Sequence, residues 1–322
     1  MTTVWVIGEH DGAGSLTAAT GELLTKARAL GDTVDLVALG SGASTSASAE
    51  AAGGFGAGRV FACDDPALDD APRANAHVVA RMVDEHNPDL VLFATTYAGR
   101  DIAGRVQART GSALMSNATD VLSPTRARTE ILGGTQIVDV DLDGPTPIVL
   151  MKPRSIEAEP TGGGPAEVVT IAADLPPGLV DAQVEERHEA AATGPSLDDA
   201  AVVVAGGRGL GGPEAFAMLD DLASAIGGAA VGASRAAVDA GWVPYAYQIG
   251  QTGRTVKPTV YLAVGISGAL QHIVGMKGAG RIIAINKDAD APIMRLADLA
   301  VVGDLTAVVP ALTEEIRRRA GS

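Results

Sequence analysis

Cysteine is nearly absent from this sequence of 322 residues, which holds only Cys63. A single cysteine excludes an intramolecular disulfide framework and any zinc or iron–sulfur site built from several thiolates. Cys63 follows an apolar segment, which predicts a buried small side chain rather than a redox thiol. The five histidines lack the spacing of metal ligands, so we expect no metal site. They are His10, His77, His86, His188 and His272.

Long apolar runs are also missing from the chain. The longer runs, such as residues 200–205 and 148–151, fall far short of a membrane span. The first eight residues lack the basic region and apolar stretch of a signal peptide, and also the arginine-rich helix of a transit peptide. We therefore expect a cytoplasmic protein that is not embedded in a membrane.

Aromatic residues make up only 3% of the chain, although hydrophobic residues make up 47%. The cores must therefore consist mainly of Ala, Val, Leu and Ile. Such a composition suits a parallel α/β sheet with helices on both faces. The formal net charge is −15, and the isoelectric point is about 4.7. Because an acidic field repels phosphate, we expect no nucleic-acid partner.

Strand patterns alternate with helix patterns in the first third of the chain, which implies parallel βαβ units. Ser15 is the expected N-cap of the first helix, and Gly31 ends that helix. Further helices are expected at 73–85 and from about Asp101. After Ala113 the helix-length gaps disappear, and we expect antiparallel strands added to the first domain. The predicted strands are 4–8, 34–39, 59–63 and 90–94, followed by 129–132, 137–142, 148–151 and 168–171.

Residues 181–199 are polar and rich in small residues, which predicts a linker between two domains. We expect a first domain of residues 1–193 and a second of residues 194–322. The last helix of the second domain carries an apolar stripe from Leu305 to Ile316. Its predicted strands are 201–205, 229–232, 260–264, 282–285 and 299–302. The expected fold class is α/β, with two doubly wound domains. The first has extra antiparallel strands, and the second has a Rossmann-like parallel sheet.

A glycine-rich segment follows the first predicted strand of the second domain. Gly207, Gly209 and Gly212 satisfy the G-x-G-x-x-G pattern, in which peptide N–H groups approach a phosphate at a helix N-terminus. In a chain with 40 glycines, a flexible connecting loop is the alternative. Ser234 and Arg235 follow the next strand, where a NAD-binding fold would carry an acid. A hydroxyl and a guanidinium favour NADP or a flavin nucleotide instead.

Two further polar segments lie in the second domain. Gln248 and Thr252 offer uncharged hydrogen-bonding groups among glycines. Ser267 precedes a predicted helix, and His272 lies about one turn inside that helix. Ser267 does not fit the G-x-S-x-G elbow of hydrolases, because Ala269 occupies the last position. An ordinary helix histidine is the alternative for His272.

Several uncommon segments of the second domain resemble the α subunit of electron-transfer flavoprotein, in the same order and with the same spacing. They are S-R-A-A-V-D-A-G (234–241), Q-I-G-Q-T-G (248–253), A-V-G-I-S-G-A-L-Q-H-I-V-G-M-K (263–277) and I-A-I-N-K-D (283–288). The resemblance covers residues 201–318. The first domain is similar mainly in its α/β rhythm and in A-G-R-D (98–101).

In that family, this second domain holds one FAD at the junction with a smaller β subunit. The resemblance implies that Arg208 and Ser234 contact the cofactor and that Arg235 lies against the isoalloxazine ring. It also implies that Thr252 bonds the N5 edge of that ring. By the same resemblance, Asn286, Asp304 and Leu305 hold the adenosine end of FAD. The implied cofactor set is Arg208, Ser234, Arg235, Gln248, Ile249, Gly250, Gln251, Thr252, Gly265, Ser267, Gly268, Ala269, Leu270, Gln271, His272, Asn286, Lys287, Asp288, Asp304 and Leu305.

The resemblance also implies a function, that of an electron carrier in a heterodimer with the β subunit rather than an enzyme. FAD would take electrons from flavin dehydrogenases, such as the acyl-CoA dehydrogenases of fatty-acid β-oxidation, and pass them to a respiratory acceptor such as a quinone oxidoreductase. Arg235, Thr252 and His272 would tune the flavin. A donor or cation compensates the negative charge that builds near N1 and the C2 carbonyl when the ring gains an electron. The alternatives are an oxidoreductase that uses NADP or FAD on its own substrate, and a non-catalytic nucleotide sensor.

Overall fold

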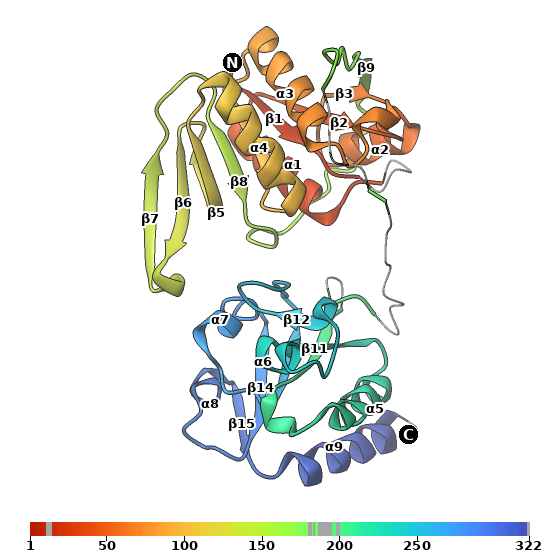
Figure 1. Ribbon diagram of the computed structural model, residues 1–322, viewed down its shortest axis with the longest axis vertical. Helices are drawn as coiled ribbons and strands as arrows, with labels where there is room; N and C mark the ends of the chain where they lie inside the picture. The colour runs from red at the N-terminus through yellow and green to blue at the C-terminus, as the bar shows by residue number, and fades with distance from the viewer. Residues whose placement is uncertain (11–14, 180–181, 183, 186–194, 198–199, 321–322) are drawn as a thin grey trace. The chain divides into compact units, whose positions relative to one another are not determined.

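The chain folds into two compact units, Met1–Arg187 and His188–Ser322 (Figure 1). This computed structural model describes all residues except 11–14, 180–181, 183, 186–194, 198–199 and 321–322. Much of the predicted linker, including the expected boundary at 193/194, lies outside the described residues. Within the described part of the chain, no helix is both long enough and apolar enough to cross a membrane.

The N-terminal unit contains a nine-stranded mixed sheet in the order β7-β6-β5-β8-β4-β1-β2-β3-β9. Its strands are β1 (Thr3–Ile7), β2 (Thr33–Leu39), β3 (Arg59–Cys63), β4 (Leu90–Ala94), β5 (Leu114–Ser123), β6 (Arg126–Ile131), β7 (Gln136–Asp141), β8 (Ile148–Met151) and β9 (Glu167–Thr170). Its α-helices are α1 (Ala18–Leu30), α2 (Ser46–Gly54), α3 (Pro72–His86) and α4 (Tyr97–Thr110).

Helices cover both faces of this sheet, as the apolar strands require. Leu24 of α1 and Ala52 of α2 pack in one core layer with strand residues such as Val6. Val79 of α3 and Val106 of α4 pack in the other layer, which contains Trp5 of β1. Adjacent residues of one strand point to opposite faces, so β1 contributes to both layers. The predicted doubly wound α/β class is therefore confirmed for this unit.

The strands after α4 are only partly antiparallel. The structure confirms antiparallel pairing of β5 with β6 and of β6 with β7. The antiparallel prediction is wrong for β8, which lies between β4 and β5 and runs parallel to both. All four residues of β8 are buried, and a continuous apolar run of this kind is typical of a strand covered on both faces. The prediction is also wrong for β9, which pairs parallel with β3 at the opposite edge of the sheet.

Two helix starts differ from the prediction. Thr17, not Ser15, caps α1, because its hydroxyl accepts a hydrogen bond from the N–H of Thr20 at 3.3 Å. The helix expected from Asp101 begins one turn earlier, where the hydroxyl of Thr96 accepts from the N–H of Gly99 at 2.9 Å. Both caps are threonines, whose hydroxyls satisfy a free N–H of the first turn.

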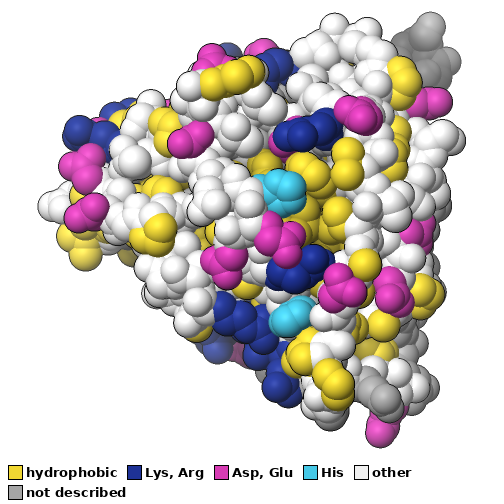
Figure 2. Space-filling model, turned by 90° about the horizontal axis from the view of Figure 1, so that it is seen from above, with side chains coloured by type: hydrophobic (Ala, Val, Ile, Leu, Met, Phe, Trp, Pro, Cys, Tyr) yellow, Lys and Arg dark blue, Asp and Glu magenta, His cyan; other side chains and the backbone are white. Residues whose placement is uncertain are grey.

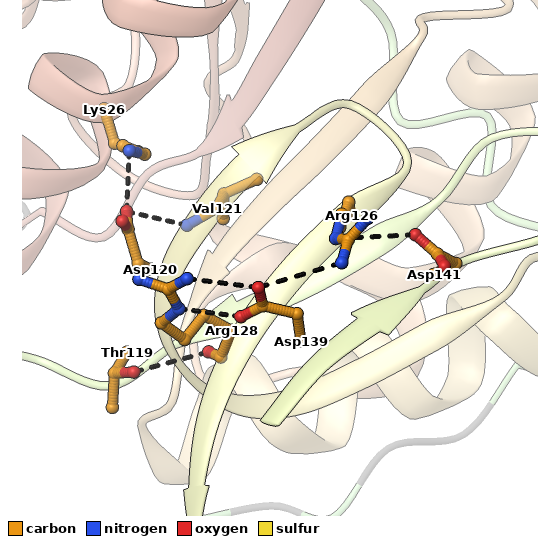
Figure 3. Close-up of polar contacts among 8 residues, drawn as sticks. All are labelled: Lys26, Thr119, Asp120, Val121, Arg126, Arg128, Asp139 and Asp141. Atoms are coloured by element: carbon orange, nitrogen blue, oxygen red, sulfur yellow. Dashed lines mark hydrogen bonds and ion pairs between the residues drawn. The ribbon is translucent and has the colours of Figure 1, made fainter. Parts of the chain in front are cut away.

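Ion pairs cross the antiparallel part of the sheet (Figure 3). Arg128 holds the carboxylate of Asp139 through two hydrogen bonds of 2.7 and 3.1 Å, and this contact lowers the pKa of Asp139. Such exposed pairs add little to stability, but they join facing side chains on neighbouring strands. The pairs between β6 and β7 are Arg128–Asp139, Arg126–Asp139 and Arg126–Asp141, and Lys26 of α1 pairs with Asp120 of β5. The end of the β6–β7 hairpin exposes the apolar residues Ile131, Leu132 and Ile137.

Charged side chains of both signs share the face of the molecule shown in Figure 2. Lys and Arg side chains lie beside Asp and Glu side chains there, with hydrophobic side chains between them. Ion pairs within helices follow the same pattern, as in Arg105–Asp101 and Arg81–Glu85. The excess of negative charge is therefore not gathered into one acidic field on this face.

The C-terminal unit contains a six-stranded sheet, and every strand pair in it is parallel. Its strands are β10 (Val202–Gly206), β11 (Ala229–Ser234), β12 (Gln248–Ile249), β13 (Val260–Val264), β14 (Arg281–Asn286) and β15 (Leu299–Val302). Its α-helices are α5 (Phe216–Ile226), α6 (Arg235–Asp239), α7 (Leu270–Ile273), α8 (Pro292–Leu296) and α9 (Leu305–Ala320). The strand order β12-β11-β10-β13-β14-β15 is the 3-2-1-4-5-6 order of the dinucleotide-binding fold.

Helices again cover both faces of the sheet. Leu219 of α5 and Val309 of α9 pack in one core layer. Ile293 of α8 packs in the other layer with Tyr261 of β13. The predicted apolar stripe of α9 is confirmed, because Leu305 and Val309 are buried and the remaining members pack against the same layer. The Rossmann-like prediction for this unit is therefore confirmed as well.

Candidate functional site

A cavity of about 700 Å³ opens at the carboxyl ends of the strands of the C-terminal sheet. The loops that follow β10, β11, β12, β13 and β14 all contribute to its lining. The strand order reverses direction between β10 and β13, and ligands of open α/β sheets bind at such a switch point. The position of the cavity alone therefore marks it as the candidate binding site.

Glycines bring two of these loops into backbone contact. The N–H of Gly207 donates to the carbonyl of Val264 at 2.9 Å, and the N–H of Gly209 donates to that of Gly265 at 2.9 Å. A Cβ atom on Gly207 would lie 2.3 Å from the carbonyl oxygen of Gly265, so the two loops leave no room for a side chain. Gly212 is different, since a Cβ there would meet the flexible side chain of Glu214 and no backbone of the β13 loop.

Ser234 and Arg235 lie where β11 meets α6, and both line the cavity. The hydroxyl of Ser234 is buried and has no hydrogen-bond partner in the described structure. Leaving such a group unpaired costs about 1–3 kcal/mol, so the hydroxyl calls for a partner supplied by a ligand. The guanidinium of Arg235 is exposed and lies 3.1 Å from the carboxylate of Asp239, which lines the cavity too.

The loop after β12 is fixed against the segment that leads into α7. The N–H of Gln251 donates to the carbonyl of Gln271 at 2.7 Å. Gly250 has a φ of +141°, and a Cβ there would lie 2.7 Å from the same carbonyl oxygen. Only glycine fits this position, for reasons of both conformation and space. Ile249, Gly250, Gln251 and Thr252 thereby form one wall of the cavity.

His272 is buried, and both of its ring nitrogens bond to groups of the protein. Nδ1 lies 3.0 Å from the carbonyl oxygen of Ile249, which can only accept, so Nδ1 carries the proton. Nε2 lies 2.8 Å from the hydroxyl of Tyr261, which then donates to it. Burial lowers the pKa of His272 to about 4 and raises that of Tyr261. His272 was expected to act as a donor or cation toward the flavin. The structure corrects this expectation to a neutral ring, because burial disfavours the charged form and both ring nitrogens bond to the protein.

The pH dependence of stability follows from His272. Its folded pKa of about 4 lies below the unfolded value of 6.5, so between these values only the unfolded chain binds the proton. We expect the free energy of unfolding to have its full value above pH 6.5. As the pH drops to 4, it should fall by up to about 3 kcal/mol, because the unfolded chain gains a proton that the folded chain does not. An NMR titration of the His272 ring tests the cause, and a midpoint near 6.5 would contradict it. His272→Asn should flatten the stability profile over the same range.

Most of the implied cofactor set lines this cavity. The members that do so are Arg208, Ser234, Arg235, Ile249, Gly250, Gln251, Thr252, Gly265, Ser267, Ala269, Gln271, His272, Asn286 and Asp288. Lining residues outside that set are Gly209, Ala236, Asp239, Ile266 and Ala291. Each of these five residues lies within four positions of a member of the set. Extending each sequence motif by four residues would therefore have included them.

Six members of the implied set do not line the cavity. Asp304 accepts hydrogen bonds from the N–H and the hydroxyl of Thr306, and so caps the start of α9. Leu305 is buried in the core, whereas Leu270 is half exposed. Gly268 packs against the backbone of Ile293, and Lys287 is exposed. Gln248 is buried next to Thr252.

Ser234→Ala should separate ligand binding from folding. Without ligand, we expect the free energy of unfolding to stay unchanged or to rise by about 1 kcal/mol, because an unpaired buried hydroxyl disappears. The affinity for the ligand of the cavity should fall about tenfold, since one hydrogen bond is lost. Thr95→Val is the matched control, because the hydroxyl of Thr95 is also buried and unpaired but does not line the cavity. Equal affinity in both variants would show that Ser234 does not contact the ligand.

Comparison with known proteins identifies the class to which this fold and site belong. Residues 4–176 match the family model of the electron transfer flavoprotein domain. Residues 196–277 match that of the electron transfer flavoprotein FAD-binding domain, which contains much of the cavity. Both units are thus those of an electron transfer flavoprotein, a class of electron carriers.

Full-length relatives identify the subunit. The chain is 38% identical over 334 residues to the electron transfer flavoprotein subunit alpha of Mycobacterium leprae, and 40% identical over 324 residues to that of Mycobacterium tuberculosis. Both alignments cover 100% of each chain. It is 35% identical over 331 residues to the subunit alpha of Thermoanaerobacterium thermosaccharolyticum, with 98% of each chain covered. The chain belongs to the α-subunit family of electron transfer flavoproteins, as its sequence segments indicate.

Proposed function

We propose that this chain binds one FAD in the cavity of its C-terminal unit and carries electrons between other redox proteins. The observation that carries the proposal is the meeting of the two glycine loops, Arg208 and the unpartnered hydroxyl of Ser234 at the switch point of the sheet. This donor set fits a dinucleotide, because a guanidinium binds phosphate oxygens and a hydroxyl bonds to phosphate or ribose oxygens. The match of residues 196–277 to a FAD-binding domain supports the same cofactor.

Each part of the cavity has a separate task in this proposal. When bound, FAD supplies the reversible uptake and release of one or two electrons. Arg235 provides positive charge. The wall from Ile249 to Thr252 provides backbone that a ligand can approach closely, and the hydroxyl of Thr252. The neutral His272 keeps its wall free of charge, since its ring nitrogens bond to Ile249 and Tyr261. Positive charge toward an electron-rich ring therefore comes from Arg235 and Arg208 rather than from His272.

We further propose the partners that the α-subunit relatives suggest. The chain would form a heterodimer with a smaller β subunit, accept electrons from flavin dehydrogenases such as acyl-CoA dehydrogenases, and deliver them to a respiratory acceptor such as a quinone oxidoreductase. The full-length similarity to α subunits of electron transfer flavoproteins supports the pairing. The cytoplasmic location and the part in fatty-acid β-oxidation remain predictions.

The test is to purify the chain together with the small subunit, record an absorption spectrum and identify the nucleotides released on denaturation. A flavin spectrum with one FAD for each copy of this chain supports the proposal. A second FAD in the complex would point to a carrier that splits electron pairs between two acceptors. Adenine nucleotide without flavin, or no nucleotide, would contradict the proposal and favour a nucleotide sensor.

We also propose that the chain transforms no organic substrate of its own. Among the residues that line the cavity, the only histidine is bonded through both ring nitrogens to protein groups. The described residues that line the cavity therefore offer no free imidazole as a general base. Mixing the purified complex with NADPH or NADH in the presence of an organic substrate tests this point, because an oxidoreductase would reduce its flavin and turn over the substrate, whereas a carrier needs a donor flavoprotein.

A further inference from the structure

Gln248 lies outside the cavity but is hydrogen-bonded to a residue that lines it. Its side-chain amide nitrogen donates to the hydroxyl oxygen of Thr252 at 3.0 Å, and the Gln248 residue is only 3% exposed. The loop closes tightly around it, because the N–H of Arg254 donates to the carbonyl of Gln248 at 2.7 Å. A Cβ on Gly253 would lie 2.3 Å from that same carbonyl oxygen. The amide therefore has a fixed place next to Thr252.

This contact determines which way the Thr252 hydroxyl acts. An amide NH₂ group can only donate, so the hydroxyl oxygen accepts from Gln248 and keeps its own proton for another partner. No residue in the described part of the chain accepts that proton. The carbonyl of Thr252 is held separately by the hydroxyl of Tyr245, which fixes the backbone of the residue. Thr252, which lines the cavity, thus offers a donor to whatever binds there.

We propose that Gln248 is a positioning residue: it turns the hydroxyl of Thr252 into a donor toward the cavity, so that the ligand atom beside Thr252 must be an acceptor. This inference rests on the proposed function for the identity of the ligand as FAD. The N5 atom of an isoalloxazine ring accepts a hydrogen bond when the ring is oxidised, and it carries a proton after two-electron reduction. A donor at that edge therefore favours the oxidised ring over the fully reduced one.

Gln248→Glu, measured at a pH where the new carboxyl group is ionised, is the decisive variant, because a carboxylate of the same size can only accept and takes the Thr252 proton away from the cavity. In the FAD-loaded complex, we expect the dissociation constant of oxidised FAD to rise about 3- to 10-fold, the effect of one lost hydrogen bond. The dissociation constant of fully reduced FAD should stay the same. The two-electron potential of the bound flavin then rises by about 15–30 mV, at about 30 mV for each tenfold change.

Thr252→Val gives the reference effect, since it removes the hydroxyl and keeps the shape of the side chain. If Gln248 acts through Thr252, Gln248→Glu and Thr252→Val shift the two dissociation constants alike, and the double variant matches Thr252→Val alone. Thr252→Ser, which keeps a hydroxyl, should behave like the unchanged protein. Gln248→Met removes the amide without adding charge, so it serves if Gln248→Glu does not fold, and its effect should also vanish in the Thr252→Val background.

Two results would overturn the proposal. If Gln248→Glu binds both forms of FAD as the unchanged protein does, the amide does not set the direction of the hydroxyl. If its effect persists in the Thr252→Val background, Gln248 acts directly or through the new charge. Failure of the proposed function gives a different result, because the unchanged complex would then contain no FAD at all.

Discussion

Gly207→Ala should abolish tight binding of FAD, with a loss of affinity of at least about 100-fold. The backbone of Gly207 is extended, with φ of −111°, so alanine meets no conformational strain there. The new methyl group would lie 2.3 Å from the carbonyl oxygen of Gly265 and 2.7 Å from Cα of Ile266. The loops after β10 and β13 must then move apart, at a cost of about 1–3 kcal/mol to folding. FAD titration by fluorescence measures the loss of affinity.

Gly211→Ala is the matched control in the same loop. Gly211 has a φ of +89°, and nothing lies within 4 Å of a Cβ placed there. Alanine therefore meets only conformational strain, which costs about 1 kcal/mol, and FAD affinity should change little. If Gly207→Ala and Gly211→Ala bind FAD equally well, the contact between the two loops does not shape the binding site.

Arg59→Ala should lower the free energy of unfolding of the N-terminal unit by about 3 kcal/mol. Asp35 of β2 is fully buried, and Arg59 of β3 holds its two carboxylate oxygens at 3.1 and 2.7 Å. Removing one partner leaves an uncompensated charge in the core, which costs about 3–5 kcal/mol. We expect the lower end of this range, because the Arg59 side chain is 42% exposed and water can reach its site. Denaturant unfolding, followed by the fluorescence of Trp5, reports the change.

A double variant separates the cost of an unpaired charge from the worth of the pair. Asp35→Leu combined with Arg59→Met removes both charges and should recover most of the lost stability, since apolar residues replace buried ion pairs at little cost. The free energy of unfolding of Arg59→Lys should lie between those of Arg59→Ala and the unchanged protein, because a lysine keeps the charge but cannot hold both carboxylate oxygens of Asp35. A loss below about 1 kcal/mol in Arg59→Ala would show that water solvates Asp35 in the folded protein.

Most strands of this fold could be predicted from apolar runs, but β5 and β12 were missed and the pairing of the strands could not be predicted. Residues 90–94, 148–151 and 260–264 match observed strands to the residue. An apolar run shows that both faces of a strand are buried, yet it says nothing about which strand lies beside it. The helix α2 was missed because S-A-S-A-E-A-A-G-G consists of small residues and carries no apolar stripe. Thr17 and Ser15 are both residue types that cap helices. Only the structure shows that α1 begins at Ala18, which makes Thr17 the cap.

Motifs that follow strands bring most of the implied cofactor set to one cavity, because the carboxyl ends of parallel strands meet at one edge of a sheet. The chemistry of the site depends on distances between side chains that cannot be read from the sequence. His272 is neutral because its ring is buried, and its two nitrogens bond to the hydroxyl of Tyr261 on β13 and to the carbonyl of Ile249 on β12. The unpaired hydroxyl of Ser234 is likewise a property of its surroundings. Asp304 and Leu305 matched a motif, but the first residue caps a helix and the second packs in the core.

The insertion of β8 between β4 and β5 has a consequence for the order of folding. Among the strands that the structure describes, β5, β6 and β7 are hydrogen-bonded to the rest of the sheet through β8 alone. These three strands precede β8 in the chain, so they can join the sheet only when the four residues of β8 have paired with β4. Loss of β8 from the sheet would release the whole meander in one cooperative opening. Its amide protons should then exchange with solvent together, and more readily than those of the parallel strands.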